Sequence, residues 1–283
     1  MITIKSPQKA RQLIAKTKAK GLCLGFVPTM GALHRGHLSL IRKARAESDF
    51  LIVSIFVNPL QFGPKEDFRK YPRKIKQDRA SLLKEGVDLL FFPESAAIYP
   101  EGASVFVYED RLSKVLCGKS RPGHFKGVST VLVKFFNIIN PDIAYFGQKD
   151  YQQGVIVKKL VADLNYNIKI KILPIIREDD NLAMSSRNVY LDDKARIKSR
   201  CIYQSLALAR NLIRKGRRDT DKIILEMTQL IRSKARVKID YIQILDANSL
   251  TKLNLINGKT LIAVAIYIDN VRLIDNIIIN VKK

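Results

Sequence analysis

Two short apolar runs on either side of one amphipathic segment constrain the fold of this chain more than any other feature. Residues 22–27 are apolar up to Pro28, and residues 50–57 are apolar up to Asn58 and Pro59. Between them, apolar side chains recur with helical spacing over about residues 37–47. A strand, a helix and a strand in so short a stretch form a βαβ unit. We therefore expect a parallel sheet that helices cover on both faces.

The alternation of helices and strands continues to about residue 180. Helices are predicted at 75–84, 128–139 and 150–164, and strands at 88–92, 105–109, 143–146 and 168–176. Later, helices at 192–214 and 219–235 precede strand-like runs at 238–245, 260–268 and 272–281. The pattern predicts an α/β fold, with a Rossmann-like doubly wound parallel sheet in residues 1–180 and a smaller C-terminal α+β domain in residues 181–283. The polar segment 177–190 at the junction is expected to be mobile.

Composition narrows the class of protein. Of the 283 residues 47% are hydrophobic, which is enough to bury a core, and no charge-free apolar run is long enough to span a membrane. The first 20 residues are basic but lack the apolar stretch of a secretory signal. The cysteines Cys23, Cys117 and Cys201 lie far apart, which argues against a disulfide framework. A cytoplasmic protein is expected.

The net charge of +24 is the most unusual bulk property. A field of that size attracts polyanions, such as nucleic acid or a phosphorylated substrate. The basic residues are spread along the whole chain, however, and the abundance of Ile, Lys and Asn is the bias expected from an AT-rich genome. Compositional drift is the favoured explanation, and a nucleic-acid partner is not expected; a selected polyanion partner is the alternative.

Two of the three histidines, His34 and His37, flank Gly36 where the first strand turns into the first helix. Parallel α/β sheets bind ligands in the crevice at the carboxyl ends of their strands. A helix N-terminus there offers unpaired N–H groups, and glycine lets a phosphate approach the backbone. The histidines are then placed to donate hydrogen bonds to phosphate oxygens. Surface or metal-binding histidines are the alternative interpretation.

The HxGH spacing resembles the signature of the nucleotidyltransferase superfamily, which includes the class I aminoacyl-tRNA synthetases. The flanking residues are more specific, because they resemble the pantothenate synthetase (pantoate–β-alanine ligase) family in seven blocks that follow in the expected order. These blocks are residues 28–41, 58–63, 71–73, 121–128, 146–153, 184–188 and 272–276. The resemblance implies that ATP activates pantoate as an acyl-adenylate with loss of pyrophosphate, and that β-alanine then displaces AMP.

The resemblance also implies roles for single residues. The catalytic candidates are His37, His34, Lys149 and Arg187, with His37 as the proton donor. Pantoate and β-alanine are expected at Gln61 and Gln153, with Asn58, Arg121 and His124 as further candidates. The expected ATP contacts are Met30, Gly31, Ala32, Leu33, His34, Arg35, Gly36, His37, Gly147, Gln148, Lys149, Asp150, Ile176, Met184, Ser185, Ser186 and Arg187.

The chemistry of these side chains is compatible with the implied roles, and each has a simpler alternative. Lys149 follows a predicted strand and offers a cation to a phosphate, but a solvated lysine is common in so basic a chain. The hydroxyls of Ser185 and Ser186 and the guanidinium of Arg187 suit a triphosphate. The alternative is that the two serines cap a helix. The amides of Gln61 and Gln153 suit a small hydroxy acid, although glutamine is usually a surface residue.

ATP is expected as a substrate with Mg²⁺, which phosphate oxygens mainly hold, and no protein metal site or tightly bound cofactor is indicated. Asp78 is a candidate magnesium ligand, but a lone acid on a basic helix is more often an ion-pair partner. The family is generally homodimeric. Two other functions stay open at this point: another HxGH adenylyltransferase, and a basic nucleic-acid-binding protein on the same fold.

Three positions depart from the family pattern. Gln148 replaces a usual glutamate, Gly154 a larger apolar residue, and Asp269 a frequent glycine. A glycine inside a helix costs about 1 kcal/mol relative to alanine. Gly154 is therefore expected to affect stability rather than chemistry, and none of the three departures removes a catalytic candidate.

Overall fold

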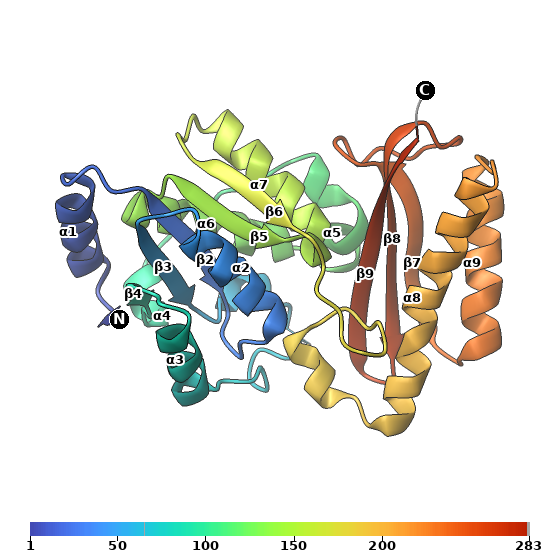
Figure 1. Ribbon diagram of the computed structural model, residues 1–283, viewed down its shortest axis with the longest axis horizontal. Helices are drawn as coiled ribbons and strands as arrows, with labels where there is room; N and C mark the ends of the chain where they lie inside the picture. The colour runs from blue at the N-terminus through green and yellow to red at the C-terminus, as the bar shows by residue number, and fades with distance from the viewer. Residues whose placement is uncertain (65, 282–283) are drawn as a thin grey trace. The chain divides into compact units, whose positions relative to one another are not determined.

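The predicted βαβ unit lies at the centre of a six-stranded parallel sheet in the computed structural model, which describes residues 1–64 and 66–281 (Figure 1). The strands are β1 (Ile2–Ile4), β2 (Leu24–Thr29), β3 (Phe50–Ile55), β4 (Leu89–Phe91), β5 (Ile143–Gly147) and β6 (Lys169–Leu173). Their order is β1-β4-β3-β2-β5-β6, so the chain runs from β2 out to β4 and then restarts beside β2 at β5. This reversal is the switch point of a doubly wound sheet, and the predicted fold class is confirmed.

Successive side chains of the sheet pack against different helices. Val27 of β2 lies in one buried cluster with Ile41 of α2 (Arg35–Arg45). Its neighbour Phe26 instead packs its ring against Phe135 of α6 (His124–Ile139), with the centroids 6.3 Å apart. Because adjacent strand residues point to opposite faces, α2 and α6 cover opposite faces of the sheet. The other helices of this part are α1 (Pro7–Lys18), η1 (Pro59–Gln61), α3 (Ile75–Lys84), α4 (Ser95–Ile98), η2 (Leu112–Lys114), α5 (Leu116–Ser120) and α7 (Tyr151–Asp163).

The C-terminal part combines a small antiparallel sheet with two long helices. Its strands β7 (Lys238–Asp246), β8 (Gly258–Ile268) and β9 (Val271–Val281) pair in that order. The helices α8 (Asp193–Arg214) and α9 (Thr220–Lys234) bury Leu206 and Met227 in one cluster with Ile262 of β8. Asp192 caps α8 by accepting a hydrogen bond from the Ala195 N–H at 2.7 Å. This is the predicted α+β arrangement.

The described residues divide into two compact units. The first comprises Met1–Gln148 and Gln153–Pro174, and the second comprises Lys149–Gln152 and the chain from Ile175 onward. The short helix η3 (Gln148–Asp150) and the start of α7 therefore lie where the chain changes unit. Within residues 1–64 and 66–281 the three cysteines are free thiols, and no helix has the length and apolar character needed to cross a bilayer.

Several predicted elements differ from the structure. The strand predicted to stop at Pro28 instead continues as β2 to Thr29. The pairing of β2 with β5 ends at Phe26, so the missing N–H of Pro28 removes no hydrogen bond from that pairing. The predicted strand at 105–109 is absent from the described structure; Val107 N–H instead donates to Thr130 Oγ1 at 3.0 Å. β1 and α1 were not predicted, although Ser6 before a proline is a helix-start signal and its side chain caps α1.

Gly154 and Ile172 are matched in shape. A Cβ atom at Gly154, in α7, would lie 2.6 Å from Cδ1 and 3.3 Å from Cγ1 of Ile172 on β6. The Ile172 side chain therefore occupies the volume that a side chain at Gly154 would take. The glycine does more than weaken the helix, because it lets α7 approach β6 closely at this point.

This packing predicts that the effect of Gly154→Ala depends on Ile172. The substitution alone gains about 1 kcal/mol of helix propensity but has to displace Ile172, so the free energy of unfolding should stay near the wild-type value or fall. After Ile172→Val, which removes Cδ1, Gly154→Ala should raise it by about 1 kcal/mol. Urea unfolding of the wild type, both single variants and the double variant measures this coupling. An equal effect in both backgrounds would contradict the packing argument.

Candidate active site

The loop between β2 and α2 is held by a carboxylate from another helix. Asp78 of α3 is buried, with 3% exposure, and its two oxygens accept hydrogen bonds from Ala32 N–H at 2.9 Å and Leu33 N–H at 2.8 Å. Gly31 in the same loop has φ +80°, a conformation that favours glycine. The sequence suggested a magnesium ligand or an ion-pair partner at Asp78. Instead, the structure uses both oxygens to hold the backbone of the HxGH loop.

Burial affects the protonation of Asp78. Removal from water raises the pKa of this carboxyl above its usual value, and the bonds from Leu33 and Ala32 lower it in part. The two amide bonds therefore favour the ionised form of Asp78 against its burial, and the same bonds fix the shape of the loop.

His34 and His37 lie side by side at the N-terminus of α2, with ring centroids 4.0 Å apart. Nδ1 of His34 accepts a hydrogen bond from Gly36 N–H at 3.2 Å, and Nδ1 of His37 accepts one from His34 N–H at 3.4 Å. Because both Nδ1 atoms are acceptors, the proton of each neutral ring lies on Nε2. The two histidines therefore cap the helix and present N–H donors of defined tautomer.

The metal-binding alternative for these histidines finds no support in the structure. Across residues 1–64 and 66–281, no group of three or more His, Cys, Asp and Glu side chains is arranged to hold a metal ion.

A second group of candidates gathers after β3. The Gln61 amide donates to Met30 Sδ at 2.9 Å, which joins the loop after β3 to the loop after β2. Asn58 donates to Gln61 Oε1 at 3.2 Å and to the Gly127 carbonyl at 3.0 Å, and it accepts from the Tyr99 hydroxyl at 2.9 Å. Asn58 is buried, with 1% exposure. It therefore orients Gln61 within the protein.

Arg121 and His124 bind the main chain of Gln61. The Gln61 carbonyl accepts hydrogen bonds from Arg121 Nη2 at 3.2 Å and from His124 Nδ1 at 2.8 Å. The Arg121 guanidinium also forms two 2.6 Å contacts with Glu66. Burial opposes the ionisation of Glu66, but Arg121 outweighs it and holds the pKa of Glu66 below its usual value. The structure thus brings both predicted residues to Gln61, where they hold its backbone.

Gly127 contributes to this group and was not singled out from the sequence. A Cβ atom there would lie 2.4 Å from the carbonyl carbon and oxygen of Leu60 and 2.5 Å from Gln61 N. No side chain fits, so α6 rests directly on the backbone of η1. An isolated glycine inside a helical pattern is the signal that points to such a close approach.

The remaining candidates of the first unit lie after β5. Gly147 is the last residue of that strand, and a Cβ there would meet no described atom within 4 Å. Gln148 follows in η3. Gln153 is half-buried in the first turn of α7 and takes no part in the hydrogen bonds around Gln61 given above.

Lys149 and Asp150 belong to the second unit. The Lys149 carbonyl accepts a hydrogen bond from the Asn276 side-chain amide at 2.9 Å. Its ammonium group lies 3.5 Å from the Asp150 carboxylate, and the Lys149 side chain is 22% exposed. The backbone of Lys149 is therefore fixed to β9, and its charged end is partly accessible to solvent.

The polar segment that was expected to be mobile is folded into a hairpin. The candidates Ile176 and Met184 face each other across it, with Met184 N–H donating to the Ile176 carbonyl at 3.0 Å. The turn contains Asn181, whose φ of +69° is tolerated by asparagine better than by most residues. Ser185 then caps η4 (Ser186–Tyr190) by accepting from Arg187 N–H at 3.3 Å. The helix-cap alternative is therefore realised, at η4.

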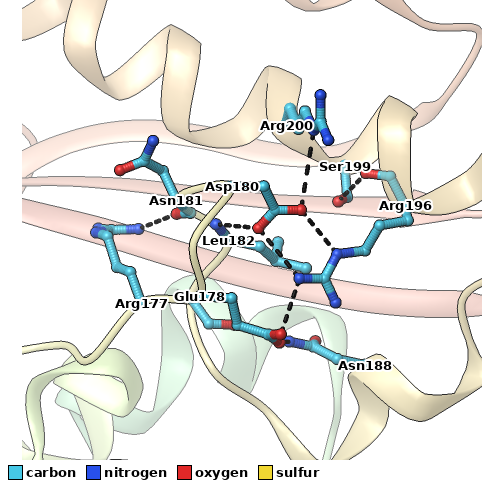
Figure 2. Close-up of polar contacts among 10 residues, drawn as sticks. Arg177, Glu178, Asp180, Asn181, Leu182, Asn188, Arg196, Ser199 and Arg200 are labelled. Carbon is cyan, nitrogen blue, oxygen red and sulfur yellow. Dashed lines mark hydrogen bonds and ion pairs between the residues drawn. The ribbon is translucent and has the colours of Figure 1, made fainter.

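One arginine of α8 clamps this hairpin (Figure 2). Arg196 binds Asp180 through two contacts of 2.8 and 3.1 Å and Glu178 through one of 2.8 Å. Glu178 also accepts from the Asn188 amide at 2.6 Å, on the far side of Ser185–Arg187. The Arg196 guanidinium lowers the pKa of Asp180. The segment 184–187 is therefore tied to the hairpin at both ends, through the Ile176 carbonyl before it and the Glu178 carboxylate after it.

The comparisons with known proteins all point to one family. The sequence model of one family, described as pantoate-beta-alanine ligase, matches residues 2–278. The pantothenate synthetase of Thermosipho melanesiensis is 52% identical over 279 residues, covering 99% of both chains. The crystal structure of the Thermus thermophilus pantothenate synthetase superposes with a TM-score of 0.93 at 40% identity, covering 98% of this chain and 99% of that chain.

A further solved structure has ligands in its description. The pantoate-beta-alanine ligase from Francisella tularensis, described as complexed with beta-gamma ATP and beta-alanine, matches at 40% identity with a TM-score of 0.82. It covers 98% of this chain and 97% of that chain. On a whole-length family match and relatives of this identity, the chain belongs to the pantoate–β-alanine ligase family.

Proposed function

We propose that this chain joins pantoate to β-alanine in two steps that consume ATP. In the first, a carboxylate oxygen of pantoate attacks the α-phosphorus of ATP and pyrophosphate leaves. In the second, the amine of β-alanine attacks the acyl carbon of pantoyl-adenylate, AMP leaves with the bonding electron pair, and the nitrogen loses a proton. The observation that carries the proposal is the HxGH loop, held by Asp78 in a chain that matches this ligase family over its length.

The loop after β2 supports adenylate chemistry. Negative charge increases on the phosphates as pyrophosphate departs, and preorganised donors stabilise it without further reorganisation. His34 and His37 supply Nε2–H donors beside the N-terminus of α2, where the helix dipole also favours an anion. The family resemblance further proposes Lys149 and Arg187 as cations, and Ser185 and Ser186 as hydroxyl donors, for the phosphates of ATP. The other ATP contacts implied by the resemblance stay predictions.

The group around Gln61 supports an acid-binding role. Its side chain is held by Met30 and Asn58, and its main chain by Arg121 and His124. Such support restricts the Gln61 side-chain amide to few positions. Recognition of the hydroxyls and carboxylate of pantoate requires an amide that is held in this way. Gln61 is therefore a proposed pantoate ligand, and the family resemblance makes Gln153 a second one. Asn58, Arg121 and His124 are proposed to act by placing Gln61.

Several wider features belong to the same proposal. Mg²⁺ is expected to accompany ATP, held by phosphate oxygens, because hard cations prefer them and keep few protein ligands. A homodimer, a cytoplasmic location, and the division into an ATP- and pantoate-binding domain (1–180) and a C-terminal domain (181–283) also stay predictions. The alternatives, another HxGH adenylyltransferase or a basic nucleic-acid-binding protein, are not favoured by the family match.

The reaction predicts strict dependence on all substrates. With ATP, Mg²⁺, pantoate and β-alanine, the wild type should form AMP and pantothenate in equal amounts, and omission of any substrate should abolish pantothenate. His37→Ala should lower kcat by about 10²–10³, the usual effect of removing one donor to a developing charge. Mass spectrometry of both products provides the measurement. A folded wild type that forms neither product would refute the proposed function.

The contacts of Asp78 predict a positioning effect. Asp78→Asn leaves one acceptor oxygen for two loop amides, so the histidine loop should loosen and kcat should fall about tenfold or more. Asp88→Asn is a matched control, because Asp88 also accepts from a backbone amide, Leu51 N–H at 2.7 Å, where β3 begins. It should lower the melting temperature and leave kcat unchanged.

A magnesium titration separates the two roles of Asp78. If the residue only holds the loop, raising Mg²⁺ should not restore the activity of Asp78→Asn. Recovery of wild-type kcat at high Mg²⁺ would instead identify Asp78 as a metal ligand and contradict the positioning role.

A further inference from the structure

The block Arg272–Asn276 is part of the family resemblance, yet the proposed reaction gives it no task. Its last two residues, Asp275 and Asn276, are buried, with 3% and 4% exposure. They lie within β9, paired with Val264 and Ala263 of β8. Buried polar side chains of this kind need partners, because leaving them unpaired is costly. Their partners in the structure identify what they hold.

Asn276 holds the segment that contains Lys149. Its side-chain amide donates to the Lys149 carbonyl at 2.9 Å. In the same segment, two residues after Lys149, the Tyr151 hydroxyl donates a hydrogen bond to the Ala247 carbonyl at 2.9 Å in a buried contact. Hydrogen bonds from Asn276 and to Ala247 therefore hold the segment 149–152 within the second unit, and the bond from Asn276 is made to the lysine itself.

Asp275 holds the hairpin that precedes Ser185–Arg187. Its carboxylate forms contacts of 2.6 and 3.1 Å with the Arg177 guanidinium. The same guanidinium donates to the Asn181 carbonyl at 3.0 Å, across the hairpin turn (Figure 2), and lies over the Tyr203 ring of α8. Burial raises the pKa of Asp275, and the Arg177 guanidinium, the Asn276 backbone N–H and the charge of Lys149 oppose this in part.

Adjacent residues of a strand point to opposite faces, so β9 binds a different segment on each face. Asp275 shares its face with Leu273 and Ile277, which lie in the core cluster of this unit. The strand itself is paired with β8 along its whole length. A rigid strand thus fixes two loops whose sequence positions are separated by more than 20 residues.

We propose that Asp275 and Asn276 are positioning residues for the phosphate-binding groups of this enzyme. Asn276 sets the backbone from which Lys149 projects, and Asp275, through Arg177, sets the hairpin from which Ser185, Ser186 and Arg187 follow. The inference rests on the proposed function, because it takes Lys149 and Arg187 to be phosphate ligands. Arg196 clamps the same hairpin from α8, so the hairpin has charged partners on two elements (Figure 2).

The first test uses Asn276→Ala with and without Lys149→Ala. Asn276→Ala should lower kcat for pantoyl-adenylate formation about tenfold or more, because a small misplacement of a charge-stabilising group is amplified in the rate. Binding of pantoate, measured by calorimetry, should not change. In the Lys149→Ala background the same substitution should have no further effect on kcat. An equal fold-loss in both backgrounds would overturn the role assigned to Asn276.

The second test uses Asp275→Asn with and without Arg187→Ala. Asp275→Asn should lower kcat in the wild type and have no further effect on kcat in the Arg187→Ala background. Asp240→Asn is the matched control. Asp240 forms a 2.7 Å ion pair with Arg272 of the same block, and the two side chains are 15% and 14% exposed. This control should lower the melting temperature and leave kcat unchanged. An equal loss of kcat in Asp240→Asn and Asp275→Asn would show a general effect of stability and overturn the proposal.

Wild-type activity separates this inference from the proposed function. If the wild type makes pantothenate while Asn276→Ala and Asp275→Asn match its kcat, only the positioning role fails. If the wild type forms no AMP, the proposed reaction fails, and calorimetric titration with ATP decides the positioning role. Asn276→Ala should then weaken ATP binding in the wild type but not in Lys149→Ala; equal weakening in both would overturn it. Asn276→Ala removes no charge, so this variant still tests the positioning role if Asp275→Asn does not fold.

Discussion

The backbone N–H groups between β2 and α2 lie outside the backbone hydrogen bonds of strand and helix, and the first unit has to supply acceptors for them. A loop that offers amides to an anion must keep its shape before the anion arrives, and here that shape comes from protein acceptors. Asp78 takes the amides of Ala32 and Leu33, and Nδ1 atoms of His34 and His37 take two more at the helix start. The capping that satisfies these groups also sets the tautomer of both histidines. Structure and chemistry at this loop therefore depend on the same bonds.

The second unit meets a similar requirement with buried charges. Its phosphate-binding candidates lie on short segments with little regular structure, and such segments need external partners to hold one conformation. On β9, Asp275 binds Arg177 and Asn276 binds the Lys149 carbonyl. On α8, Arg196 binds both Glu178 and Asp180. The polar character of residues 177–190 suggested a mobile linker, but its charged residues Arg177, Glu178 and Asp180 instead pair with Asp275 of β9 and Arg196 of α8.

Prediction from the sequence succeeded where the signal was local. Helix α3 begins and ends at the predicted residues 75 and 84, and most other elements lie within a few residues of their predicted bounds. It failed where neighbours decide the outcome. Pro28 stays in β2 because the ladder with β5 has already ended, and residues 105–109 form no strand although their composition favours one. Short β1 depends on pairing with β4, a partner more than 80 residues away.

The sequence by itself determined the fold class and the family and supplied the candidate site residues, because these follow from apolar periodicity and from motifs of adjacent residues. Only the tertiary structure decided what holds those residues. Asp78 reaches a loop 45 positions away, Arg121 reaches Gln61 across 60, and Asn276 reaches Lys149 across 127. Such partners carry no local pattern, since a hydrogen bond depends on distance and direction in space and not on separation along the chain.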